Sequence, residues 1–221
     1  MLRGLVWVAL ALVLAAGVAA APVRVAAAPA AVVADAPAYD AAGNMKLPEN
    51  YREWVYLTSG LDMNYNTAAP VTGHSVFDNV FVNPTSYRAF LATGTWPDKT
   101  TFILEIRGAE AHASIDRRGQ SQGATVNAIE AHVKDEARIP AKWGFFEFGS
   151  DKLAKITERP ASCYTCHEAH AAVDTTFVQF YPTLIGVAKA KGTLSPEYLK
   201  DTAIPGASNT GVAGAGASGG K

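Results

Sequence analysis

Two cysteines and a histidine near residue 165 are the residues of this chain best suited to cofactor chemistry. Cys163, Cys166 and His167 form the motif C-x-x-C-H, and the 221-residue chain contains two cysteines in all. Two thiols three positions apart lie on one helical turn, where both can add to the vinyl groups of one haem. The imidazole that follows can bind the haem iron as proximal ligand. The motif therefore predicts one covalently attached c-type haem held by these three residues.

The C-x-x-C pair has three other interpretations: a redox-active dithiol, a disulfide, or half of a zinc site. A redox dithiol usually follows a strand of a βαβ unit, at a helix start that lowers the thiol pKa. Residues 158–162 do not have the composition of such a strand. A structural zinc ion needs about four nitrogen or sulfur ligands, and the sequence has no second C-x-x-C and no H-x-x-x-H. Haem attachment is favoured, with a dithiol or a disulfide as the alternative.

The N-terminal residues have the composition of a secretory signal peptide. Arg3 provides a positive start, residues 5–14 are apolar, and the small residues up to Ala21 offer an A-x-A-like cleavage site. A transmembrane anchor is less favoured, because Pro22 and Arg24 follow directly after the apolar run. Since c-type haem is attached outside the bacterial inner membrane, the signal and the motif support each other. Together they predict a periplasmic protein.

The chain divides by composition into four parts. Residues 1–21 are the expected signal peptide, residues 22–46 an Ala- and Pro-rich linker, residues 47–203 one folded domain, and residues 204–221 a disordered tail of Gly, Ala and Ser. The chain has 19 basic and 20 acidic residues, a net charge of −1. Because it has no basic stripe, nucleic acid is not an expected partner.

Within the expected domain, the residue patterns change between those of strands and those of helices. Strands are predicted at 54–59, 76–82, 100–107, 124–134 and 143–148, and helices at 84–93, 161–172 and 177–190. Asn83 and Pro84 are typical of a helix start, and Gly94 of a helix end. Hairpin-like spacing without regular βαβ alternation favours an α+β fold. It would be mainly an antiparallel β-sheet with a few helices, one carrying the C-x-x-C-H site.

Five sequence blocks, in order over nearly all of the expected domain, resemble the cytochrome P460 family, which includes the cytochromes called c′-beta. The first two blocks are residues 47–54 and residues 80–87. The third consists of Thr93, Gly94, Trp96 and Glu105. The fourth is residues 133–135 with 143–148, and the fifth is residues 163–167 with Asp174 and 177–182. The resemblance implies a mostly antiparallel β fold with one haem, a proximal histidine and an open distal face. It also implies a homodimer in the periplasm.

The resemblance offers two functions that differ at one residue. In cytochrome P460 itself a lysine is cross-linked to the haem, and the modified haem oxidises hydroxylamine. The c′-beta members lack this lysine, and their apolar distal pocket binds nitric oxide or carbon monoxide. Leu104 occupies the lysine position here, Asp78 matches a distal arginine, and Lys99 and Lys134 are the nearest lysines. A cytochrome that binds a small gas, or passes electrons to a partner cytochrome, is therefore favoured over a hydroxylamine-oxidising enzyme.

Strand alternation predicts which side chains share the haem side of the sheet. Phe102 and Leu104 point to one face of their strand, and we expect them, with Asp78 of the neighbouring strand, in the distal pocket. The same aromatic and aliphatic residues would also suit an ordinary sheet core. A third interpretation is an electron carrier whose iron has a sixth ligand, His74 or Met63, and does not react with carbon monoxide.

Overall fold

The computed structural model describes residues 35–63, 74–112 and 114–203. The expected signal peptide and the expected C-terminal tail lie outside these residues. The described part contains two antiparallel sheets, of three and five strands, together with four α-helices. The predicted α+β class with mainly antiparallel sheet is thereby confirmed. None of the helices in the described ranges has the length and apolar character needed to cross a membrane.

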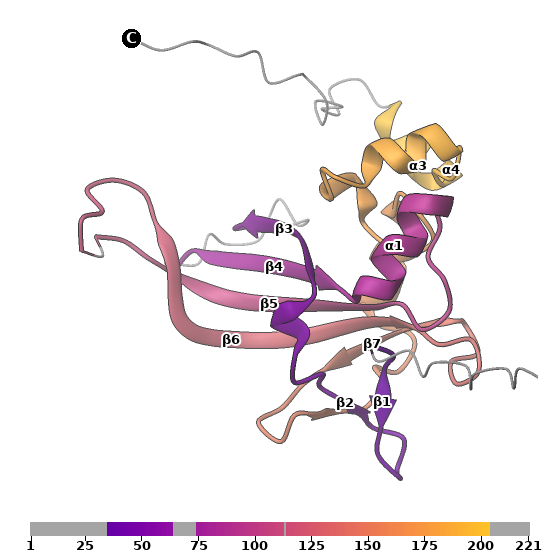
Figure 1. Cartoon of the computed structure of the whole chain (residues 1–221), viewed down its shortest axis with the longest axis horizontal. Coiled ribbons are helices and arrows are strands. Elements are labelled where there is room, and N and C mark those ends of the chain that lie inside the picture. The colour runs from indigo at the N-terminus through magenta and orange to yellow at the C-terminus, as the bar shows by residue number, and fades with distance from the viewer. Residues whose placement is uncertain (1–34, 64–73, 113, 204–221) are drawn as a thin grey trace, which may run out of the picture. The chain divides into compact units, whose positions relative to one another are not determined.

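The larger sheet has the strand order β3-β4-β5-β6-β7, and every neighbouring pair is antiparallel. The strands are β3 (Val55–Leu61), β4 (Val76–Val82), β5 (Thr101–Glu110), β6 (Ser121–Lys134) and β7 (Trp143–Glu147). Figure 1 shows β4, β5 and β6 side by side, with α1, α3 and α4 gathered near one end of them. The register places Val80, Leu104 and Glu130 next to one another across these three strands. All five predicted strands are present, and β5 and β6 extend further toward the hairpin that joins them.

A smaller sheet shows that the folded domain begins earlier than residue 47. Strand β1 (Ala38–Tyr39) pairs with β2 (Met45–Lys46), which pairs with β8 (Leu153–Ala154). The Met45 side chain is fully buried in a core cluster that also contains Ile103. The expected linker over residues 22–46 is therefore wrong for its last residues, whereas residues 22–34 lie outside the described part. These short strands are held in place because β2 pairs with β8, which is distant in the sequence. Local composition does not reveal such a pairing.

Helix α1 joins β4 to β5, and the other three helices lie in the C-terminal segment after β8. The helices are α1 (Pro84–Thr93), α2 (Ser162–His170), α3 (Ile185–Lys191) and α4 (Pro196–Thr202), with 3₁₀ turns η1 (Tyr51–Glu53) and η2 (Val178–Phe180). Helix α1 has the predicted bounds, and Gly94 ends it with a left-handed φ of 75°. Asn83 occupies the N-cap position, but its side-chain oxygen accepts a hydrogen bond from the Thr101 N–H at 2.9 Å instead of capping the helix.

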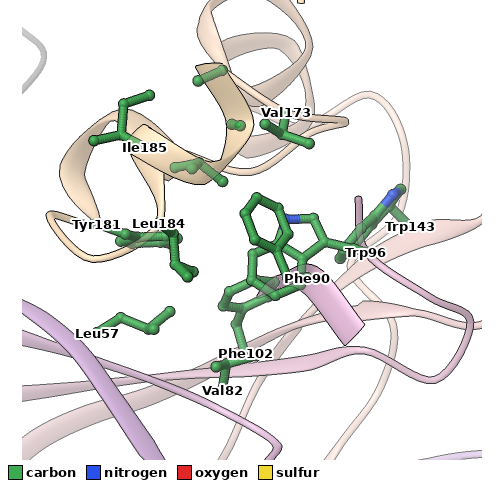
Figure 2. Close-up of a cluster of buried hydrophobic side chains, with 13 residues drawn as sticks. Leu57, Val82, Phe90, Trp96, Phe102, Trp143, Val173, Tyr181, Leu184 and Ile185 are labelled. Atoms are coloured by element: carbon green, nitrogen blue, oxygen red, sulfur yellow. The ribbon is translucent and has the colours of Figure 1, made fainter. Parts of the chain in front are cut away.

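One apolar core cluster joins the C-terminal segment to the sheet (Figure 2). Phe90 of α1 and Trp96 of the following turn lie at its centre, with ring centroids 4.1 Å apart. Phe102 of β5 meets the Trp96 ring edge to face at 4.8 Å, and Leu184 and Ile185 close the cluster from the side of α3. Burial of these large apolar side chains fixes the segment after α2 against β5.

The side chain of Glu105 lies on the face of β5 opposite to that of Phe102, where it is the centre of a buried ionic cluster. Glu105 is 3% exposed. It accepts hydrogen bonds from Tyr51 and Arg107, and from Arg52 Nε at 2.9 Å. Burial acts to raise the pKa of Glu105, but the hydrogen bonds from Arg107, Tyr51 and Arg52 outweigh it, so the pKa is lowered. The cluster ties η1 to the sheet behind the site.

Candidate haem site

A cavity of about 740 Å³ lies against the five-stranded sheet. Its volume falls within the range of about 300–1,000 Å³ that is typical of small-molecule and cofactor sites. The structure brings all six side chains predicted for the site to this cavity: Cys163, Cys166, His167, Phe102, Leu104 and Asp78. The C-x-x-C-H motif and the predicted pocket residues, far apart in the sequence, thus share one space.

Residues of five neighbouring strands form what we call the sheet wall of the cavity. They are Thr58 and Gly60 of β3, Asp78 and Val80 of β4, Phe102 and Leu104 of β5, Glu130, Ala131 and His132 of β6, and Phe145 of β7. The alternation expected for β5 is correct, since Phe102 and Leu104 reach the cavity while Ile103 is buried in the core cluster behind the sheet. Phe102 belongs to both the wall and the main core.

Helix α2 and the segment after it form the helix wall. Its members are Ser162, Cys163, Cys166 and His167 of α2, followed by Thr176, Phe177, Phe180 and Tyr181. Tyr164, between the two cysteines, is buried, and its hydroxyl donates a hydrogen bond to the Thr157 carbonyl at 2.8 Å. Its ring meets that of Phe145 edge to face at 4.9 Å. Tyr164 thereby fixes α2 against β7, with the motif residues at the cavity.

The protonation of His167 is set by a backbone carbonyl. Its Nδ1 lies 2.7 Å from the carbonyl oxygen of Thr175. Because a carbonyl oxygen can only accept, Nδ1 carries the hydrogen. Burial lowers the pKa of His167, although the bond to Thr175 acts in the opposite direction. The ring is therefore neutral, with its lone pair on Nε2, which is the form that binds a metal ion.

A chain of buried hydrogen bonds holds Thr175 in place. The indole N–H of Trp96 donates to the hydroxyl of Thr176 at 2.8 Å, and this hydroxyl donates to the Val173 carbonyl at 2.8 Å. Thr176 and Val173 also pair as an isolated β-bridge around the turn. The turn that orients His167 is thus attached to the main core through Trp96.

His132 is a member of the site that the sequence did not identify. It is buried, and its Nε2 forms a hydrogen bond with the Thr175 hydroxyl at 3.2 Å. Its ring stacks on Phe145 with centroids 4.1 Å apart, and it meets the His167 ring edge to face at 5.0 Å. Burial, and then the nearby His167, lower the pKa of His132 well below its usual value, so this ring is neutral as well. It lies opposite Phe102 in the register of β6 and β5, and because this register is set by long-range pairing, the local sequence carries no signal for His132.

The two cysteines are free thiols in the structure. Burial raises the pKa of Cys166, whereas a redox-active dithiol needs a thiol whose pKa is lowered. Within the described ranges, no three His, Cys, Asp or Glu side chains converge to hold a metal ion. A large, mostly apolar cavity with two thiols and the neutral imidazole of His167 beside them fits a haem better than it fits a dithiol centre or a zinc ion.

Two carboxylates interrupt the apolar sheet wall. Burial raises the pKa of Asp78, and the charge of Asp62 adds to this effect. Burial also raises the pKa of Glu130, followed by the charges of Glu147 and Asp78. Asp78 was expected in the pocket, but Glu130 was not. Neither has a hydrogen-bond or ion-pair partner among the residues that the structure describes.

The cavity lining also bears on two earlier questions: which lysine could reach the haem, and which residue could be a sixth iron ligand. No lysine is among the described residues that line it. Lys99 pairs with Asp135, and Lys134 donates to the Trp96 carbonyl at 2.7 Å. Met63 lines the cavity, whereas His74 is exposed and does not. Of the two expected candidates for a sixth ligand, the geometry therefore favours Met63 over His74.

Comparison with known families agrees with this site. The model of the family described as Cytochrome P460 matches residues 48–178, more than half of the chain. The matched range contains the strands of the sheet wall and the C-x-x-C-H helix. No match was found among curated proteins. The chain belongs to the cytochrome P460 family and is a cytochrome that binds haem and iron.

Proposed function

We propose that this chain is an exported c-type cytochrome that holds one haem covalently through Cys163 and Cys166, with His167 as proximal iron ligand. The support is that both thiols and the imidazole line one cavity, and that Thr175 keeps Nε2 of His167 unprotonated. A bound haem supplies an iron that exchanges electrons and binds small gases. The proposed export into the periplasm rests on the sequence pattern of residues 1–21.

We further propose that the sheet wall forms an open, largely apolar distal site that binds a small diatomic gas such as nitric oxide. The cytochrome would bind this gas, transfer electrons, or do both. The observation that carries this proposal is Leu104 at the centre of the wall, with Val80 beside it in the register. Leu104 has no nucleophilic atom, so it cannot form the cross-link that hydroxylamine-oxidising members carry. Hydroxylamine oxidation is the alternative, and it would need a lysine other than those that line the described cavity, because no lysine is among its described lining residues.

In this proposal the residues around His167 and the residues around Leu104 have separate tasks. Thr175 and the aromatic rings of His132, Phe145 and Phe177 hold the His167 ring in one orientation. The apolar residues of the sheet wall exclude bulk water and offer no hydrogen bond to a bound gas. A redox partner cytochrome would then approach from outside the cavity.

The test of covalent attachment is the haem content of protein exported in a bacterium that matures c-type cytochromes. We expect one haem per chain to remain bound after denaturation, as read by intact mass and by the spectrum of the pyridine complex. The double variant Cys163→Ser, Cys166→Ser should lose it. His170→Ala, an exposed residue on the same helix, is the matched control and should keep it. Haem that is extracted from the unaltered protein by acid and organic solvent would contradict covalent attachment.

Localisation and assembly form two further parts of the proposal. We expect the mature chain in the periplasmic fraction, cleaved near Ala21, and a homodimer as the resemblance implies. N-terminal sequencing of the fraction and the mass of the holoprotein in solution test them separately. Protein retained in the membrane with its first 21 residues would contradict the proposed cleavage.

A further inference from the structure

The two carboxylates of the sheet wall stand on either side of the central leucine. Glu130 of β6 is the direct register partner of Leu104, and Val80 of β4 is its partner on the other side. Asp78 precedes Val80 by two positions and therefore shares its face of β4. Both carboxylates line the same cavity. They are placed to act on whatever binds beside Leu104.

These carboxylates differ from the other buried acids of the described fold. Glu105 is held by Arg52 and Arg107, and Asp135 is held by Lys99 and Tyr39. Asp78 and Glu130 have no basic side chain beside them among the described lining residues. The titratable groups that face them are also acidic, Asp62 next to Asp78 and Glu147 next to Glu130, while buried His132 is neutral.

We infer that Asp78 and Glu130 set the ligand selectivity of this cavity: they disfavour anions and favour small ligands that donate an N–H or O–H hydrogen to a carboxylate. The inference rests on the proposed haem site and deepens it. A carboxylate charge that lines a partly buried cavity repels an anionic ligand in the same cavity, because screening by water is weak there. The affinity for a neutral ligand without a hydrogen-bond donor, such as carbon monoxide, does not depend on the two carboxylates.

The test compares three probes on the holoprotein at mildly alkaline pH, where the carboxylates are ionised. Azide is the anion, hydroxylamine the neutral donor and carbon monoxide the indifferent ligand, each followed by the shift of the Soret band. We expect Asp78→Asn and Glu130→Gln each to raise the affinity of the ferric protein for azide about tenfold, and the double variant about a hundredfold. Hydroxylamine binding should weaken in the same variants, and ferrous carbon monoxide affinity should stay constant.

Glu110→Gln is the matched control, because Glu110 is an exposed carboxylate on β5 that does not line the cavity. It should leave all three affinities unchanged. Azide affinity that is equal in the double variant and the unaltered protein would overturn the inference. Asn and Gln keep the shape of Asp and Glu, and the haem content of each variant verifies that it folds. A protein without covalent haem would instead refute the proposed function, so the two failures are distinguishable.

Discussion

The backbone carbonyl of Thr175 accepts a hydrogen bond from Nδ1 of His167 at 2.7 Å. This bond fixes both the tautomer and the orientation of the ring that we propose as the proximal ligand. Thr175 itself is held by its neighbours, since the Thr176 hydroxyl accepts from Trp96 in the core. The proximal side is thus positioned by packing that reaches well beyond the C-x-x-C-H motif.

Replacing Thr175 with valine should destabilise the holoprotein. The change removes the hydroxyl that bonds to Nε2 of His132 and keeps the carbonyl that serves His167. A buried polar atom left without its partner costs about 1–3 kcal/mol. We expect the free energy of unfolding in urea to fall by that amount, with Thr175→Ser, which retains the hydroxyl, close to the unaltered protein. Equal losses in both variants would contradict a role for this hydrogen bond.

Glu105→Gln should lower stability strongly at neutral pH. The folded-state pKa of Glu105 is lowered, so its contribution is present above the unfolded-state pKa and is lost as the pH falls through the folded-state pKa. Breaking a buried ionic cluster costs about 3–5 kcal/mol. Urea unfolding should show this loss at neutral pH and a much smaller one at strongly acidic pH. Exposed Glu53 provides the control Glu53→Gln, and a pH-independent loss at Glu105 would argue against the ionic origin.

Glu130→Gln should raise stability at neutral pH, whereas Glu105→Gln should lower it. The pKa of Glu130 is raised, so its protonated form favours the fold at low pH and this advantage is lost as the pH rises through the raised value. At neutral pH the glutamine variant should therefore be more stable, by less than about 1 kcal/mol, because the carboxylate still contacts solvent. Thermal unfolding at neutral and at acidic pH measures the difference. A variant that is less stable at neutral pH would show that Glu130 has a stabilising partner.

Leu104→Lys places an amine at the position that the sequence resemblance assigns to the cross-linking lysine of hydroxylamine-oxidising members of the family. Because Glu130 is its register partner, an ion pair would keep this amine protonated, and the double variant Leu104→Lys, Glu130→Gln should react more readily. We expect a red-shifted Soret band in the matured double variant. Leu104→Met is the control without an amine. An unchanged spectrum in the double variant would show that Leu104 does not occupy the lysine position.

The alternation of residues identified one strand of the sheet wall, and long-range pairing determined the rest. Phe102 and Leu104 could be assigned to the cavity because two-residue periodicity is a local property of β5. Glu130 and His132 could not, since their face depends on how β6 pairs with β5. The Thr175 carbonyl leaves no signal at all in a sequence, because every residue has one.

Local patterns predicted α1 and the haem helix well, because capping residues and motif spacing mark them. They failed for the strands β1 and β2, whose residues are ordered by pairing with β8 and by the burial of Met45. A short strand has little periodicity of its own, so tertiary contacts decide its structure.

The optical spectrum of the exported protein in its ferric, ferrous and carbon monoxide-bound ferrous forms tests the central claim most directly. The account predicts an ordinary c-type Soret band that shifts when the gas is added, because Leu104 and its apolar neighbours, which line the cavity, would supply no ligand to a bound iron. A strongly red-shifted band would contradict it by revealing a cross-linked haem. A ferrous spectrum that does not respond to carbon monoxide would contradict the open site and indicate a sixth protein ligand; of the expected candidates His74 and Met63, Met63 lines the cavity.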